Sequence, residues 1–121
     1  MPGVLVVDDE PDMRVLVEAV IERANEGLAV VGVAANGSEA IECWRETNPD
    51  VILLDHRMPD MTGLEAAEAI LAEQPDQRII LYSAYIDADT TRRATQLGIR
   101  ACVSKGDLGA LPDALWRYGT G

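Results

Sequence analysis

Five polar side chains follow apolar stretches of this sequence, where they could share one site. Asp8 and Asp9 follow the first stretch, Asp55 the third, Ser83 the fourth and Lys105 the fifth. Three neighbouring carboxylates repel one another and raise each other's pKa unless a cation offsets their charge. Mg²⁺ suits such a group of acids, because it binds one or two carboxylates together with water and phosphate oxygens.

With such a cation in place, one carboxylate can act as a nucleophile toward phosphorus. Aspartate accepts a phosphoryl group in this way and forms an acyl phosphate. The transferred group carries negative charge on its oxygens, so it needs positive charge and hydrogen-bond donors around it, which Ser83 and Lys105 would supply. Asp55 is the best candidate nucleophile, because its strand is expected at the centre of the sheet, between the acid pair and the two donors.

Each of these residues also has an ordinary explanation when taken singly. An aspartate after a strand is often a turn residue or a helix cap, and a lone serine or lysine is usually a loop or surface residue. The argument for a site therefore depends on a fold that brings the five residues together.

Five short apolar runs predict the strands of that fold. Most are nearly continuous in Val, Ile and Leu rather than alternating with polar residues, which is typical of parallel strands covered on both faces. The runs cover residues 4–7, 28–34, 51–54, 78–82 and 101–104.

Segments with helical spacing separate the strands. Apolar residues recur at helical intervals over residues 13–24, Leu16 among them, and Gly27 is expected to end this first helix. The second helix is expected to begin after Ser38 as its N-cap and to end at Asn48-Pro49.

The later helices are of unequal quality. Thr62 and Glu65 have capping-box spacing before an apolar third helix. The fourth, residues 88–97, is polar, with Ala94 and Leu97 as its only apolar anchors. Pro112 marks the first turn of a short last helix.

Strands that alternate with helices predict an α/β fold, a three-layer, doubly wound, five-stranded parallel sheet with strand order 2-1-3-4-5, which is flavodoxin-like. In such sheets ligands bind outside the carboxyl ends of the strands, near the switch point between strands 1 and 3. The five polar residues all follow these ends.

Composition limits the classes of function. A chain of 121 residues suits one domain, spanning residues 1–121, and the net charge of −11 argues against direct binding of nucleic acid or anionic membranes. The sequence has neither a signal peptide nor a run long enough to cross a membrane, so we expect a soluble, cytoplasmic protein. Cys43 and Cys102 lack metal-site spacing and are expected to be reduced and partly buried.

From about residue 4 to residue 111, the sequence resembles a known family, the receiver domain of bacterial two-component response regulators. The motifs are Val-Asp-Asp-Glu-Pro at 7–11, Leu-Leu-Asp-x-Arg-Met-Pro-x-Met-x-Gly at 53–63, Ser-Ala at 83–84, and Lys at 105. The resemblance implies that Asp55 accepts phosphate from the phosphohistidine of a sensor histidine kinase. It implies that Asp9 and Asp55 bind Mg²⁺ or Mn²⁺ directly and that the backbone carbonyl of Arg57 completes the protein ligands. Asp8 would contact the ion through water or support the residues that bind it.

The resemblance also implies a switch. Ser83, followed by Ala84, would bond one phosphoryl oxygen and Lys105 another, which would remodel the surface near the fourth strand, fourth helix and fifth strand. The sequence departs from the family at one position. Three residues before the lysine the family often has an aromatic residue, whereas this sequence has Cys102. Tyr85 is a candidate substitute for this aromatic gate, and Arg57 and Tyr85 are candidate modulators of acyl-phosphate lifetime.

Three alternatives remain beside the phosphorylated switch. One is a degenerate receiver that only binds partners. A second is an aspartyl-nucleophile phosphatase of the haloacid-dehalogenase kind, in which an acid usually stands where Arg57 stands. A flavin-binding module is the third, although the acids at residues 8–10 would repel its phosphate. As a receiver, the chain would catalyse only its own phosphorylation and dephosphorylation. It would act on an output domain after Gly121 or on a separate protein. It could form homodimers, as relatives do.

Overall fold

The structure, a computed structural model, describes residues 2–24 and 27–119, so the ends of the expected domain at residues 1 and 120–121 lie outside the described residues. Its strands form one parallel sheet in the order β2-β1-β3-β4-β5, which confirms the predicted topology. The strands are β1 (Gly3–Val7), β2 (Ala29–Ala34), β3 (Val51–Asp55), β4 (Arg78–Ser83) and β5 (Ala101–Ser104).

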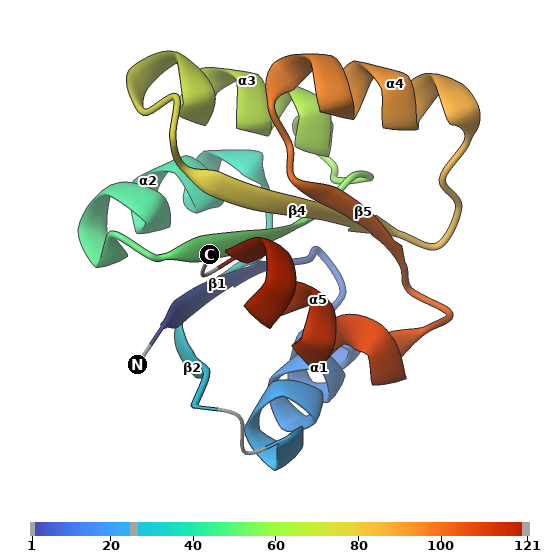
Figure 1. Cartoon of the computed structure of the whole chain (residues 1–121). Helices are drawn as coiled ribbons and strands as arrows, with labels where there is room; N and C mark the ends of the chain where they lie inside the picture. Colours follow the sequence, from blue (N-terminus) through green and yellow to red (C-terminus); the bar gives the residue numbers. More distant parts are fainter. Residues whose placement is uncertain (1, 25–26, 120–121) are drawn as a thin grey trace.

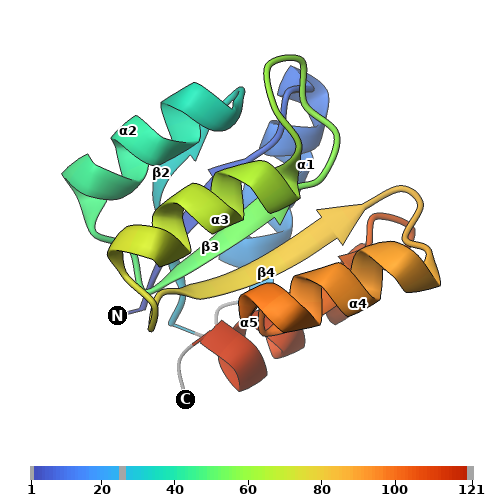
Figure 2. The same ribbon diagram turned by 90° about the horizontal axis from the view of Figure 1, so that it is seen from above.

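Helices cover both faces of this sheet, as Figure 1 shows. One face carries α2 (Gly37–Thr47), α3 (Gly63–Glu73) and α4 (Ala88–Leu97), and the other carries α1 (Pro11–Ala24) and α5 (Leu111–Gly119). Seen from above, α3 lies between α2 and α4 (Figure 2). No helix among the described residues is both long enough and apolar enough to cross a membrane.

Two apolar clusters lie on either side of the central strands. Alternate residues of a strand point to opposite faces, so Leu5 and Leu54 pack under α2 and α3 while Val6 and Leu53 pack against α1 and α5. Every residue of β1 and β3 is buried. Burial on both faces explains why these strands are apolar along their length. The polar site residues therefore come only where the buried strands end.

The helix ends agree with the sequence in part. The capping box of Thr62 and Glu65 is present, and Asn48 ends α2 with a left-handed φ of 48°. The prediction that Ser38 caps α2 was wrong, because Asn36 accepts the N–H of Glu39 at 2.9 Å in that role. Ser38 lies two residues further along the helix, and its own N–H donates to Asp60 Oδ2 at 2.9 Å.

Three further details differ from the expectations. Leu16 has the helical spacing of its apolar neighbours but is 48% exposed, because α1 buries only Val17 and Ile21. Gly27 has a φ of +82°, yet α1 already ends at Ala24, and residues 25–26 lie outside the described part. A short 3-10 helix, Leu108–Ala110, precedes α5.

Candidate functional site

Three aspartates from two neighbouring strands form an acid pocket. Asp8 and Asp9 follow β1 and Asp55 ends β3, and one carboxylate oxygen of each lies within 4.8 Å of the others. Asp8 and Asp55 are 0% and 2% exposed, whereas Asp9 is accessible to solvent. Carboxylate oxygens gathered in this way are the donors that a hard divalent cation takes.

Lys105 joins the two buried acids. Its Nζ lies 3.0 Å from Asp8 Oδ2 and 3.2 Å from Asp55 Oδ2, and only 10% of its side chain is exposed. The lysine follows β5, and its backbone N–H donates to the carbonyl of Ser83 at 2.9 Å. The parallel pairing of β4 with β5 therefore brings Lys105 over the acids.

The buried charges alter one another's pKa. Burial, opposed by Lys105 and reinforced by the neighbouring Asp8, raises the pKa of Asp55 to about 7. Burial would raise the pKa of Asp8 too, but hydrogen bonds from Tyr82, the Glu10 N–H and Lys105 outweigh it and leave that pKa lowered. Without a metal, Asp55 thus resists ionisation, and added positive charge would favour its anion.

An open pocket of about 180 Å³ lies beside these groups. Ser83 is 2% exposed, and its Oγ accepts the Tyr85 N–H at 3.4 Å. The space is large enough for small polar groups, and it is bordered by carboxylates, a hydroxyl and an ammonium group. Its lining residues are Asp9, Glu10, Asp55, Arg57, Ser83, Ala84 and Lys105.

Two residues expected to modulate the site lie outside this lining. Tyr85 is 68% exposed, and Cys102 packs against the apolar cluster under α3 and α4. Burial raises the pKa of the Cys102 thiol. Both cysteines are free and partly buried, as expected. The aromatic gate at Tyr85 therefore stays a prediction.

Sequence reasoning missed Tyr82 and Arg14. The Tyr82 hydroxyl donates to Asp8 Oδ2, and Arg14 Nη1 donates to the Asp8 carbonyl at 2.6 Å. A tyrosine in an apolar strand run looks like a core residue, so only its place directly before Ser83 pointed toward the site.

The loop between Asp55 and α3 is held at both ends. The Gly63 N–H donates to the His56 carbonyl at 2.7 Å, and a Cβ at Gly63 would lie 2.5 Å from the Asp55 carbonyl oxygen. At the far side, Asp60 accepts the N–H groups of Gly37 and Ser38 at 2.9 Å each. These hydrogen bonds lower the pKa of Asp60 to about 2.

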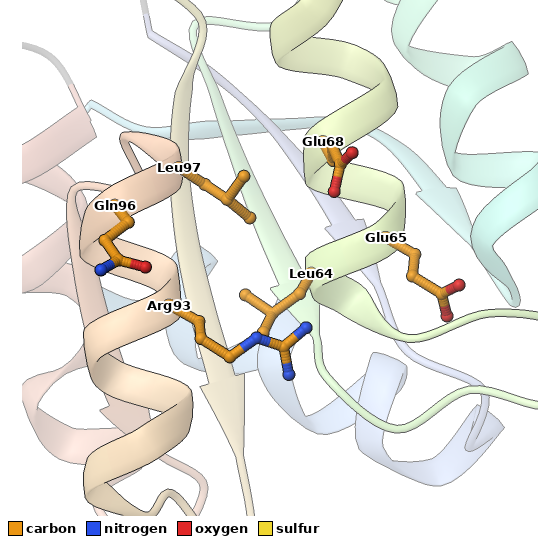
Figure 3. A pocket seen from close by; sticks show the side chains of 6 residues that line it. All are labelled: Leu64, Glu65, Glu68, Arg93, Gln96 and Leu97. Atoms are coloured by element: carbon orange, nitrogen blue, oxygen red, sulfur yellow. The ribbon is translucent and has the colours of Figure 1, made fainter.

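A separate pocket of about 140 Å³ lies between α3 and α4. Figure 3 shows Leu64 and Leu97 facing each other across it, with Arg93 reaching over from α4. The other lining residues are Glu65, Glu68 and Gln96. This pocket marks a loose contact between the two helices rather than a gathering of reactive groups.

Comparison with known proteins identifies the family. The model of the "Response regulator receiver domain" family matches residues 4–115. The chain belongs to this family. The receiver is also 43% identical over 103 residues to a protein-glutamate methylesterase/protein-glutamine glutaminase of Agrobacterium fabrum, covering 84% of this chain and 29% of the relative. The chemotaxis protein CheY of Thermotoga maritima is 41% identical over 81 residues, 67% of this chain and 66% of that protein.

Solved structures agree with this assignment. The response regulator domain of Thermotoga maritima CheB superposes with a TM-score of 0.89 at 30% identity, covering 98% of this receiver and 96% of that chain. A LuxR-family two-component response regulator from Aurantimonas sp. gives 0.90 at 31% identity, covering 95% and 82%. The receiver spans 28–32% of the length of the first methylesterases it matches.

Proposed function

We propose that this receiver is a phosphorylation switch in which Asp55 accepts a phosphoryl group from the phosphohistidine of a sensor histidine kinase. An Asp55 oxygen would form the new P–O bond while the P–N bond of the donor breaks and its electron pair returns to the imidazole. The observation that carries the proposal is the arrangement of Asp55 in an open pocket, with Lys105 3.2 Å from its Oδ2 and two further aspartates beside it.

The acid pocket would hold the divalent cation. Asp9, which is accessible, and Asp55 would bind Mg²⁺ or Mn²⁺ directly with the backbone carbonyl of Arg57, and the buried Asp8 would act through water or orient its neighbours. The bound cation supplies charge neutralisation for the incoming phosphoryl oxygens. Because Asp55 has a raised pKa, the cation would also favour its ionised, nucleophilic form.

Phosphorylation would change the partners of Lys105 and Ser83. Lys105 now pairs with both buried acids, and a phosphoryl group on Asp55 would offer it a more highly charged partner. Ser83, with Ala84, would close on another phosphoryl oxygen. Ser83 ends β4 and Lys105 follows β5, the two strands that α4 connects. Their movement would therefore remodel the surface formed by β4, α4 and β5.

A partner would read this surface. We expect a cytoplasmic sensor kinase as phosphodonor and an output domain or separate downstream protein as recipient, with a homodimer as one form of assembly. The match to receivers joined to methylesterases supports an attached output domain. Within the receiver, we expect no catalysis beyond its own phosphorylation and dephosphorylation.

Incubation with Mg²⁺ and acetyl phosphate, followed by intact-mass measurement, tests the proposal. The wild type should gain the mass of one phosphoryl group and lose it again on standing, and chelation of Mg²⁺ should prevent the gain. Asp55→Asn should gain nothing, while Asp76→Asn, an exposed aspartate before β4, should behave as the wild type. An undiminished adduct on Asp55→Asn, or none on the wild type, would refute the assignment.

A further inference from the structure

Tyr82 is a buried aromatic residue that reaches from β4 to the acid pocket. In the sheet it lies between Asp55 of β3 and Val103 of β5, its register partners. Register partners on adjacent strands point to the same face, so the ring lies on the side of α1 and α5, where it packs with their apolar cluster. With 0% exposure, the ring is fixed by packing on this side of the pocket.

The hydroxyl of Tyr82 is one of three donors to the Asp8 carboxylate. It donates to Oδ2, which also receives Lys105 Nζ at 3.0 Å, while the Glu10 N–H donates to Oδ1 at 2.9 Å. Because an ionised carboxylate can only accept hydrogen bonds, the Tyr82 hydroxyl is the donor of this pair. Both oxygens of a fully buried carboxylate are thus engaged by protein groups.

These donors differ in how firmly they stay in place. Lys105 is shared with Asp55 and would move to a phosphoryl oxygen in the proposed function. The Glu10 N–H and the Tyr82 hydroxyl belong to backbone and to a locked ring. A buried carboxylate that loses a donor pays a desolvation cost, so Tyr82 is the side chain that limits this cost when Lys105 changes partners.

The ring of Tyr82 also faces the lysine. Lys105 Nζ lies 5.0 Å from the ring centroid, within the range of a cation–π interaction. Replacement by phenylalanine keeps this contact and the packing, and it removes only the hydroxyl. The two contributions of Tyr82 can therefore be separated by a single substitution.

We propose that Tyr82 is a positioning residue of the acid pocket, whose hydroxyl holds the Asp8 carboxylate in the orientation required for the divalent cation. This inference rests on the proposed function and adds a residue to it. Groups that hydrogen-bond to metal-site carboxylates commonly contribute 10-fold or more to metal affinity. Because Asp8 is expected to act through water, the loss of its tyrosine partner should fall at or below the low end of that range.

Mn²⁺ binding to the unphosphorylated protein tests the inference. It is measured by the electron paramagnetic resonance signal of the free ion. Tyr82→Phe should raise the dissociation constant about 3- to 10-fold. Tyr118→Phe, which alters a tyrosine of α5 that is 40% exposed, should leave it unchanged. In acetyl phosphate reactions, Tyr82→Phe should raise the half-saturating Mg²⁺ concentration by the same factor and keep the maximal rate.

Other results would overturn the inference. Unchanged or tighter Mn²⁺ binding by Tyr82→Phe would do so, as would a lower maximal rate at an unchanged half-saturating Mg²⁺ concentration, which is the signature of a merely structural role. If Tyr82→Phe does not fold, the NMR spectrum of the wild type decides, because Tyr82 should give a phenol proton protected from exchange and its absence would refute the hydrogen bond.

Failure of the proposed function would look different. A wild type that binds Mn²⁺ but gains no phosphoryl group would refute the phosphoacceptor role, while the Mn²⁺ affinities of the variants would still judge Tyr82. A wild type that neither binds Mn²⁺ nor gains a phosphoryl group would refute both.

Discussion

Helices α3 and α4 lie side by side over the same face of the sheet, yet they are attached to it very differently (Figure 2). Helix α3 has a capping box and buries six of its eleven residues, whereas α4 buries only Ala94 of its ten. The buried residues of α3 are Gly63, Leu64, Ala66, Ala67, Ile70 and Leu71. The side that carries Asp55 is therefore packed more firmly, and the helix that follows Ser83 has fewer buried residues.

In the proposed function, this difference would give the two sides of the site separate tasks. A nucleophile must stay in place for transfer, which suits the strand that leads to α3. A switch must have an element with few buried contacts, because regions of low local stability are the ones that move at low cost.

Glycine positions in the two helices should give the largest contrast. In Gly63→Ala the new methyl group would lie 2.5 Å from the Asp55 carbonyl oxygen and 2.9 Å from the His56 Cα, both backbone atoms. We expect a loss of about 3 kcal/mol in the free energy of unfolding, the upper end of the usual cost of overpacking, measured with urea. Gly98→Ala at the end of α4 meets no atom within 4 Å, and its φ of +99° should cost only about 1 kcal/mol. Equal losses would contradict the contrast.

The leucines that face each other between the helices should differ in the same direction. Leu64 of α3 is 2% exposed, whereas Leu97 of α4 is only partly buried (Figure 3). Leu64→Ala should cost about 2–3 kcal/mol and Leu97→Ala about 1 kcal/mol in chemical denaturation. If Leu97→Ala were the more damaging, α4 would be the better anchored helix.

The acid pocket between the two sides should give a pH effect of known sign. In the folded protein the pKa of Asp55 is raised from 3.8 to about 7, so the folded state holds this proton more tightly than the unfolded state. Between these values stability should fall as pH rises, when Mg²⁺ is absent. Asp55→Asn should remove this decline and exceed the wild type by on the order of 1–2 kcal/mol at pH 8. Parallel pH profiles of the two proteins would contradict the raised pKa.

The N-caps should give the smallest difference, confined to the first turns. Asp87 caps α4 by accepting the Thr90 N–H, which lowers its pKa below 3.8. A lowered pKa contributes stability that is present above pH 3.8 and is lost as pH falls through the folded value. The Thr90 amide resonance should therefore shift in acid, and Asp87→Asn should abolish the shift. The Thr62 hydroxyl does not titrate, so α3 should keep one cap bond at the same pH.

The sequence predicted the sheet and the meeting of most candidate site residues, because buried parallel strands leave a strong signal. The alternation of apolar strands with helices predicted the strand order, and that order places the polar residues after the strands at one edge of the sheet. Asp8, Asp55 and Lys105 meet as expected. Their joint position follows from topology alone, without knowledge of any side-chain rotamer.

Details that depend on neighbours from distant elements could not be predicted. Tyr82 differs from an ordinary core residue only in that its hydroxyl donates to Asp8. By residue type Asn36 and Ser38 are equally good N-caps, and the contact of Asp60 with the Ser38 N–H separates them. Leu16 fits the apolar spacing of α1, but no element covers that part of the helix well enough to bury it. These outcomes are decided by packing between elements rather than by local pattern.

Amide hydrogen exchange with and without phosphorylation tests the central claim, that a phosphoryl group on Asp55 moves the α4 side against a fixed α3 side. Wild-type protein in Mg²⁺ should change its exchange in residues 83–105 after addition of acetyl phosphate, while residues 63–73 should stay unchanged. Asp55→Asn should show no change in either segment. Equal changes in both segments, or none in residues 83–105 of a protein shown by mass to be phosphorylated, would contradict the account.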